Sequence, residues 1–301
     1  KRQPIYCVQT DKPQIAISFD AAWGNQDTAA LLDILAKHQV KATFFMTGGW
    51  VSSYPDDVKK IYEAGHDLGN HSENHKYMTK LSDEEKTQEL MSVHNKVKEL
   101  TGYDMFLFRP PYGDYDNDVV KNARANHYYP IQWDVDSLDW KDYGADDIIK
   151  RVTEDSHLGN GSIILCHNGA KYTKDALDTL ITTLQDKGYE FVPVSQLIYK
   201  ENYHMDHEGR QIPSIPYTPF FYLCSTVLRV PDSPCRHFIK SPAISSFYQL
   251  HGCQRFPCLT PGPGPCIGSP VYRDRFVKQI SGKSLQPAHR LPQLRLLFPV
   301  P

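Results

Sequence analysis

Two histidines four residues apart in the segment NHSENH give the strongest local signal in the sequence. His71 and His75 can reach one divalent ion from a helical turn or a compact loop, because imidazoles at this spacing can point to a common centre. Taken alone, the pattern also fits a pair of surface histidines. The metal interpretation is favoured because other residues capable of chemistry occur at equivalent places along the chain.

Residues of catalytic type follow several short apolar runs. They are Asp20 after IAISF, His71 after HDLGN, Arg109 after FLF, Asp134 and Asp136 after IQW, and His167 after SIILC. If the runs are parallel strands, their carboxyl ends meet at one edge and these side chains form one site. Such a set can transfer protons, stabilise charge and bind a metal.

The elements that must position these residues are alternating strands and helices. Apolar runs such as IAISF, KATFFM, SIILC and YEFVPV alternate with amphipathic stretches such as DTAALLDILAKH and KDALDTLITTLQDKG. This order indicates βα units around a mostly parallel sheet. About seven units are visible, so we predict an α/β fold, a distorted (β/α) barrel with about seven parallel strands.

The composition changes near Gln211. Residues 212–301 hold 15 of the 22 prolines, 5 of the 7 cysteines and only 2 of the 35 acidic residues. Residues 1–211 carry 23 basic and 33 acidic side chains, so this part is acidic and lacks the broad basic surface of a nucleic-acid-binding protein. The sequence contains no run of about 18 apolar residues and therefore predicts no membrane span.

Three segments are therefore expected. Residues 1–14 form an N-terminal lead-in, residues 15–211 the folded domain, and residues 212–301 a Pro/Cys-rich basic tail without a native fold. The odd number of tail cysteines argues against a closed disulfide module, and a basic envelope-binding extension is the functional alternative. The chain starts with Lys1 rather than Met, which suggests that a signal peptide or anchor has been removed. We expect a monomer.

Five segments together resemble the motifs of a known family. SFDAAWG, HSENH, RPPYG, DSLDW and LCH, in this order, resemble the motifs of the polysaccharide deacetylases, carbohydrate esterases of family 4 with the NodB-homology fold. The likeness covers residues 15–199. SFDAAWG in place of the commoner T-F-D-D-G, with MDHEGRQ at the end of the domain, resembles the sporulation-associated branch of spore-forming bacteria.

The resemblance implies a hydrolase that removes N-acetyl groups from N-acetylhexosamines of a cell-wall glycan, either peptidoglycan or a chitin-like polymer. His71 and His75 would hold a divalent metal ion, Zn²⁺ or alternatively Co²⁺, Ni²⁺ or Mn²⁺. Asp20 would act as general base, with Arg109 orienting it. The chain would act outside the cytoplasm, on the cell envelope or the spore.

The remaining roles carried over from the family concern the leaving group and the substrate. His167 would protonate the leaving amine, oriented by Asp139. The backbone N–H of Tyr112 would bind the developing oxyanion. Trp140 and Leu165 would form the apolar wall against the acetyl methyl group.

One position departs from the family pattern. Ala21 stands where the family places a metal-binding aspartate, and alanine has no donor atom. Loss of an anionic ligand weakens metal binding. Three interpretations stay open: a deacetylase with a weakened metal site, a catalytically weak glycan-binding protein of the envelope, and a metal-poor hydrolase of another C–N bond.

Overall fold

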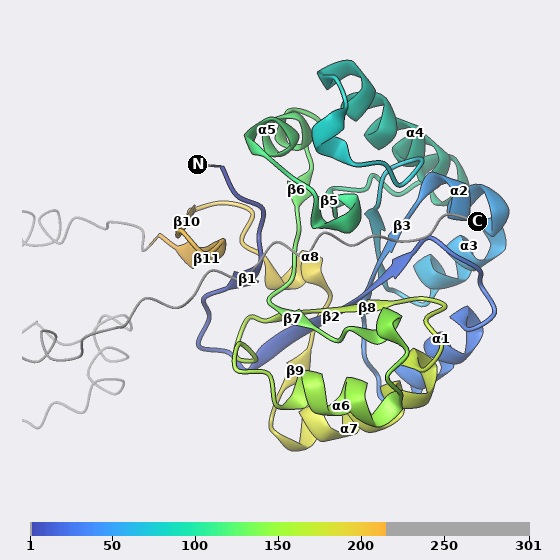
Figure 1. Ribbon diagram of the computed structural model, residues 1–301, viewed down its shortest axis with the longest axis vertical. Helices are drawn as coiled ribbons and strands as arrows, with labels where there is room; N and C mark the ends of the chain where they lie inside the picture. Colours follow the sequence, from blue (N-terminus) through green and yellow to red (C-terminus); the bar gives the residue numbers. More distant parts are fainter. Residues whose placement is uncertain (1, 215–301) are drawn as a thin grey trace, which may run out of the picture. The chain divides into compact units, whose positions relative to one another are not determined.

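The computed structural model describes residues 2–214 of the chain (Figure 1). Apart from its first three residues, the predicted tail, with its five cysteines, lies outside the described residues. The predicted boundary after Gln211 falls inside a strand, because β11 spans Arg210–Pro213.

A parallel sheet forms the centre of the domain. Its strands run in the order β6-β5-β4-β3-β2-β8-β7, and every pairing between them is parallel. A further strand, β9 (Glu190–Phe191), pairs in parallel with the beginning of β2. The strands are β2 (Gln14–Ala21), β3 (Thr43–Met46), β4 (Asp67–Asn70), β5 (Leu107–Phe108), β6 (Tyr129–Pro130), β7 (Val135–Asp136) and β8 (Ile163–His167). The seven strands curl into a half-barrel, which confirms the predicted distorted (β/α) barrel.

Helices cover the outer face of this sheet (Figure 1). They are α1 (Thr28–Lys37), α2 (Gly48–Ser53), α3 (Pro55–Glu63), α4 (Asp83–Thr101), α5 (Asn117–Ala125), α6 (Ala145–Thr153) and α7 (Thr173–Asp186). The short helix α8 (Val194–Leu197) lies on the other face, where Val194 and Leu197 pack with Ala16. Local sequence sets the bounds of α4: Ser82 and Glu85 form a capping box at its start, and Gly102 ends it at φ 74°.

Side chains of β2 alternate between two apolar clusters. Ile15, Ile17 and Phe19 belong to the cluster shared with the outer helices, whereas Ala16 belongs to the cluster inside the barrel. Because the strand period is two, Asp20 shares the face of Ala16 and points into the barrel. Sequence alternation in this strand therefore decides which residue reaches the site.

A small second sheet joins the two ends of the domain. β1 (Cys7–Val8) pairs in parallel with β11, and β10 (Tyr203–Met205) pairs with β11 in the antiparallel sense. The predicted lead-in thus contains a strand, and Ile5 and Val8 are buried in the inner cluster. None of the helices within residues 2–214 is both long and apolar enough to cross a membrane.

Candidate active site

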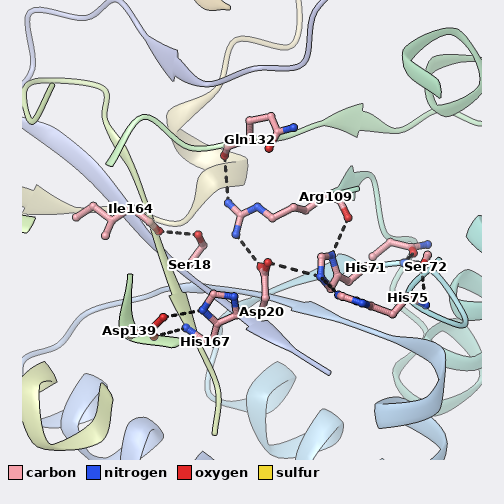
Figure 2. Close-up of polar contacts among 11 residues, drawn as sticks. Ser18, Asp20, His71, Ser72, His75, Arg109, Gln132, Asp139, Ile164 and His167 are labelled. Atoms are coloured by element: carbon pink, nitrogen blue, oxygen red, sulfur yellow. Dashed lines mark hydrogen bonds and ion pairs between the residues drawn. The ribbon is translucent and has the colours of Figure 1, made fainter. Parts of the chain in front are cut away.

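A buried ion pair occupies the centre of the barrel mouth (Figure 2). Arg109, which follows β5, donates from Nη1 to Asp20 Oδ1 at 2.8 Å, and the two side chains are 0% and 7% exposed. Arg109 Nη2 donates to the Gln132 carbonyl at 3.2 Å, and the guanidinium lies 4.1 Å from the ring centroid of Phe45. These contacts fix the arginine, so the carboxylate beside it has a defined orientation.

The charges around Asp20 determine its protonation state. Burial alone would raise the pKa of Asp20, but the positive charge of Arg109 and the nearby His71 and His167 outweigh it, so the pKa lies below the ordinary value. Asp20 is therefore a carboxylate at neutral pH and can accept a proton.

The two histidines of NHSENH face one another. His71 donates from Nδ1 to the Arg109 carbonyl at 2.8 Å, which leaves its Nε2 available as an acceptor. His75 Nε2 lies 3.2 Å from His71 Nε2, and Asp20 Oδ2 lies 3.6 Å from the same nitrogen. Burial lowers the pKa of His71, and burial, followed by the repulsion that two protonated rings would exert on each other, lowers the pKa of His75 to about 3. Both rings are neutral at pH 7.

Residues 71–75, the histidine loop, form a compact turn rather than a helix. Ser72 and His75 have φ angles of 67° and 53°. The His75 N–H donates to Ser72 Oγ at 3.0 Å, and the Ser72 N–H donates to Asn70 Oδ1 at 2.9 Å. From α4, the buried carboxylate of Glu89 accepts from Asn74 N at 2.7 Å and from its Nδ2 at 2.9 Å. The loop is held from both sides.

A second charged pair stands across from Asp20. His167, the last residue of β8, is the register partner of Asp20. Its Nδ1 lies 2.7 Å from Asp139 Oδ1, and Asp139 Oδ2 accepts from the His167 N–H at 2.7 Å and from Thr173 Oγ1 at 2.6 Å. Burial opposes the charge on His167, but Asp139 outweighs it and raises the pKa to about 9. At neutral pH this imidazole is protonated.

The other predicted residues occupy neighbouring positions. Tyr112 lies in the short turn η2 (Pro111–Gly113) with φ 59°, and its ring centroid is 4.5 Å from that of His75. Trp140 lies in η3 (Asp139–Lys141), directly after Asp139. Leu165 is 3% exposed and stands two residues before His167, on the same face of β8.

Asp134 does not join this group, contrary to the grouping by strand ends. Its Oδ1 accepts from Ile163 N at 2.8 Å and its Oδ2 from Ser162 Oγ at 3.0 Å, at the beginning of β8, whereas His167 ends that strand. The IQW segment does not end at the barrel mouth, because the chain forms the separate strand β7 after it. Asp136, the last residue of β7, accepts from Leu138 N at 2.9 Å and supports the turn toward Asp139.

Sequence reasoning missed two exposed aromatic residues at this rim. The Trp23 ring centroid lies 5.8 Å from that of His167 and 6.4 Å from that of His75. The Tyr77 ring stacks on Tyr112 at 4.3 Å. Trp23 could have been noticed, because it stands three residues after Asp20 in SFDAAWG. Tyr77 carried no comparable signal.

Comparisons with known proteins show which family the chain belongs to. The family model described as Polysaccharide deacetylase matches residues 8–131. An uncharacterized 30.6 kDa protein of Geobacillus stearothermophilus is 36% identical over 205 residues, which cover 65% of this chain and 75% of that protein. The chain belongs to the polysaccharide deacetylase family. A peptidoglycan-N-acetylglucosamine deacetylase of Bacillus cereus is 34% identical over 194 residues, covering 62% of this chain and 69% of the enzyme.

Solved structures of a peptidoglycan N-acetylglucosamine deacetylase and of a protein described as a pseudoenzyme share the fold. A structure described as a CE4 family pseudoenzyme from Bacillus anthracis matches with a TM-score of 0.63 and 33% identity, covering 70% of each chain. Some relatives are longer than the match: the chain spans 60% of the uncharacterized YlxY protein of Bacillus subtilis, to which it is 37% identical over 196 residues, 65% of this chain. The family thus includes enzymes and at least one protein described as a pseudoenzyme.

The polysaccharide deacetylase family implies a divalent metal, and the two histidines fit one as a pair. Their Nε2 atoms converge and both rings are neutral, which leaves nitrogen lone pairs for an ion such as Zn²⁺. Ala21 adds no donor, is 0% exposed and belongs to the outer apolar cluster. Within residues 2–214, no three or more His, Cys, Asp or Glu side chains are arranged to hold a metal ion.

Proposed function

We propose that this chain removes N-acetyl groups from N-acetylhexosamine residues of a cell-wall glycan, of the peptidoglycan or chitin-like type. The observation that supports this most is the pairing of Asp20 with His167 on adjacent strands. One is a buried carboxylate with a lowered pKa and the other a half-buried imidazolium with a pKa of about 9. Environments that push two pKa values apart in this way assign a base and an acid.

Asp20 accepts a proton from the water that attacks the acetamide carbonyl carbon. Arg109 keeps the carboxylate ionised and directs one oxygen, leaving Oδ2 toward the histidine pair. As the C–N bond breaks, His167 gives its Nε2 proton to the leaving amine, and acetate is the second product. Asp139 holds the His167 ring through Nδ1, so that Nε2 is the proton-donating atom.

Three further residues would bind the reacting group. The left-handed conformation of Tyr112, after two prolines, presents its backbone N–H to the developing oxyanion, a contact typically worth about 3 kcal/mol. Trp140 and Leu165 would enclose the acetyl methyl group. His71 and His75 would hold the metal ion, which polarises the carbonyl and lowers the pKa of water.

Glycan binding without turnover is the second candidate, and Ala21 is the observation that favours it. A site with two histidines and no third protein ligand among the described residues holds its ion weakly. A relative of the same fold is described as a pseudoenzyme. Either function places the chain outside the cytoplasm, where the relatives named as peptidoglycan deacetylases have their substrate.

Acetate release separates the two candidates. The chain is incubated with chitotetraose or purified peptidoglycan in the presence of Zn²⁺, Co²⁺, Ni²⁺ or Mn²⁺, or with EDTA. We expect metal-dependent acetate release that falls at least ~100-fold in Asp20→Asn and in His167→Ala, because each removes one proton transfer. Near-parental rates in both variants would refute the assigned roles. Glycan binding with no acetate under any metal would favour the second candidate.

A further inference from the structure

Two large aromatic side chains at the rim of the site are exposed to solvent. Trp23 is 48% exposed and Tyr77 is 45% exposed. Ring contacts connect both to the site in one row, from Tyr77 to Tyr112, His75 and Trp23, and then to His167. Along this series of contacts, Trp23 therefore lies between His75 and His167. Tyr77 lies at the other end, beyond Tyr112.

The loop that carries Trp23 is held rigidly on both sides of the indole. The Ala21 carbonyl accepts from Thr47 N at 3.1 Å. The next carbonyl after Trp23, that of Gly24, accepts from Trp50 Nε1 at 3.2 Å. Asn25 Nδ2 donates to an Asp57 oxygen at 2.6 Å. A fixed backbone with an exposed ring lowers the entropic cost of binding to that ring.

The segment that carries Tyr77 is held in a similar way. Met78, the next residue, is 1% exposed and packs in the outer apolar cluster. Thr79 donates its N–H and Oγ1 to Asp114 Oδ2 at 2.9 and 2.8 Å, which ties this segment to the turn of Tyr112. Tyr112 stacks on one face of the Tyr77 ring with an interplanar angle of 14°. The Tyr77 ring is thus held in place while it stays partly exposed.

We propose that Trp23 and Tyr77 are two sugar-stacking platforms that bind different pyranose rings of one glycan chain. The proposal takes its substrate class from the proposed function. A pyranose presents an apolar C–H face, which a rigid aromatic face fits, while its hydroxyl groups stay in water. Because Trp23 adjoins His75 and His167, it contacts the sugar that carries the reacting N-acetyl group. Tyr77, beyond Tyr112, contacts a sugar further along the chain.

The two positions predict different dependence on glycan length. Calorimetric titrations use the full chain with EDTA, which prevents metal-dependent hydrolysis, and either chitobiose or chitotetraose. We expect Trp23→Ala to raise the Kd for both ligands roughly 3- to 10-fold, the range of one aromatic contact. Tyr77→Ala raises the Kd for chitotetraose alone, and Trp23→Phe keeps most of the affinity.

An exposed tyrosine elsewhere supplies the matched control. Tyr62 is 39% exposed and lies in α3, which leads into the amino end of β4, whereas the site lies at the carboxyl ends of the strands. Tyr62→Ala should leave both Kd values unchanged. Quenching of tryptophan fluorescence by chitotetraose, present in the parent and reduced in a folded Trp23→Phe, gives a second readout.

The outcomes separate this proposal from the proposed function. An unchanged Kd in Trp23→Ala, or no binding by the parent, overturns the platforms even if acetate is released. Tighter binding in Trp23→Ala also overturns them, because the indole would then be obstructing the site. Loss of affinity in Trp23→Ala and Tyr77→Ala, with no acetate release from the parent, supports the platforms and removes the deacetylase.

Discussion

Ala21→Asp adds a carboxylate at the one position where the family pattern is broken. Ala21 is fully buried at the end of β2, where it pairs in register with Met46 and belongs to the apolar cluster of Phe19. Without a metal, the new carboxylate would be a buried charge, and it must turn toward the histidine pair to find a partner. We therefore expect the substitution to make folding depend on the ion.

The size of the effect follows from burial and binding. An unpartnered buried carboxylate costs about 3 kcal/mol, which for a domain of this size lowers the thermal midpoint by roughly 6–12 °C. An ion at 100 times its Kd returns about 2.7 kcal/mol, or roughly 5–11 °C. If the parent binds the ion about 100-fold more weakly, the same concentration returns only about 0.4 kcal/mol.

Thermal unfolding with EDTA and with Zn²⁺, together with calorimetric titration, measures the cost of the buried carboxylate and the stabilisation by the bound ion. Ala21→Asn is the matched control, because it has the same shape without the charge and should gain little from Zn²⁺. Ala21→Asp combined with His75→Ala should lose the gain. Zn²⁺ shifts that are equal in the parent, in Ala21→Asp and in its combination with His75→Ala, or Zn²⁺ binding by none of these variants, would refute a metal role for the histidine pair.

Three other perturbations test separate parts of the domain. Burial lowers the pKa of His66 to about 4, so the unfolded state binds more protons between pH 4 and 6.5 and stability falls as the pH falls through that window. The Ala42 N–H donates to His66 Nδ1 at 3.0 Å, and His66→Asn keeps an acceptor for it. In urea titrations this variant should remove up to about 3 kcal/mol of the loss of stability at low pH. Glu89→Gln removes one of two acceptors that hold the histidine loop, and should weaken Zn²⁺ binding about 10-fold in calorimetry with little change in midpoint. Deleting residues 218–301, the second unit of the chain, should leave the midpoint unchanged, whereas deleting 210–301 also removes β11 and should lower it.

Each of these expectations has a result that contradicts it. For His66, the pH dependence of stability would be the same in parent and variant. For Glu89, a parental Zn²⁺ affinity would show that the loop does not need its second hydrogen bond. For the deletions, a large fall in midpoint on removal of residues 218–301 would show that the described domain depends on the second unit.

The strands and the site were predictable where a buried strand leaves a recognisable apolar run in the sequence. IAISF and SIILC are continuously apolar because their strands are covered on both faces, and Asp20 and His167 stand out at the ends of these runs. Strand order along the sheet then explains why they meet, since β2 and β8 are neighbours. Pattern reasoning therefore placed Asp20 and His167 at strand ends that the structure brings side by side.

Short strands and turn geometry were not predictable in the same way. β7 has two residues and β10 has no fully buried one, so neither leaves an apolar run. Asp134 was grouped with the site because the chain between IQW and SIILC gave no sign of that separate strand. The left-handed conformation of Ser72 and His75 depends on hydrogen bonds to Asn70 and within the loop, which local propensity does not encode.

The pairing of β1 with β11 has a consequence for how the domain folds and bears load. Cys7 and Arg210 are register partners although about 200 residues separate them, so β1 is synthesised long before its partner exists. Until then Ile5 and Val8 have no complete inner cluster to enter, and the first strand docks last. The same ladder joins both ends of the domain, so fraying of β11 removes one of the contacts of the first segment, in which Ile5 and Val8 also bond to the backbone of residues 130–132 and of Gly161. A pull applied between those ends reaches this short ladder before it reaches the barrel and the site.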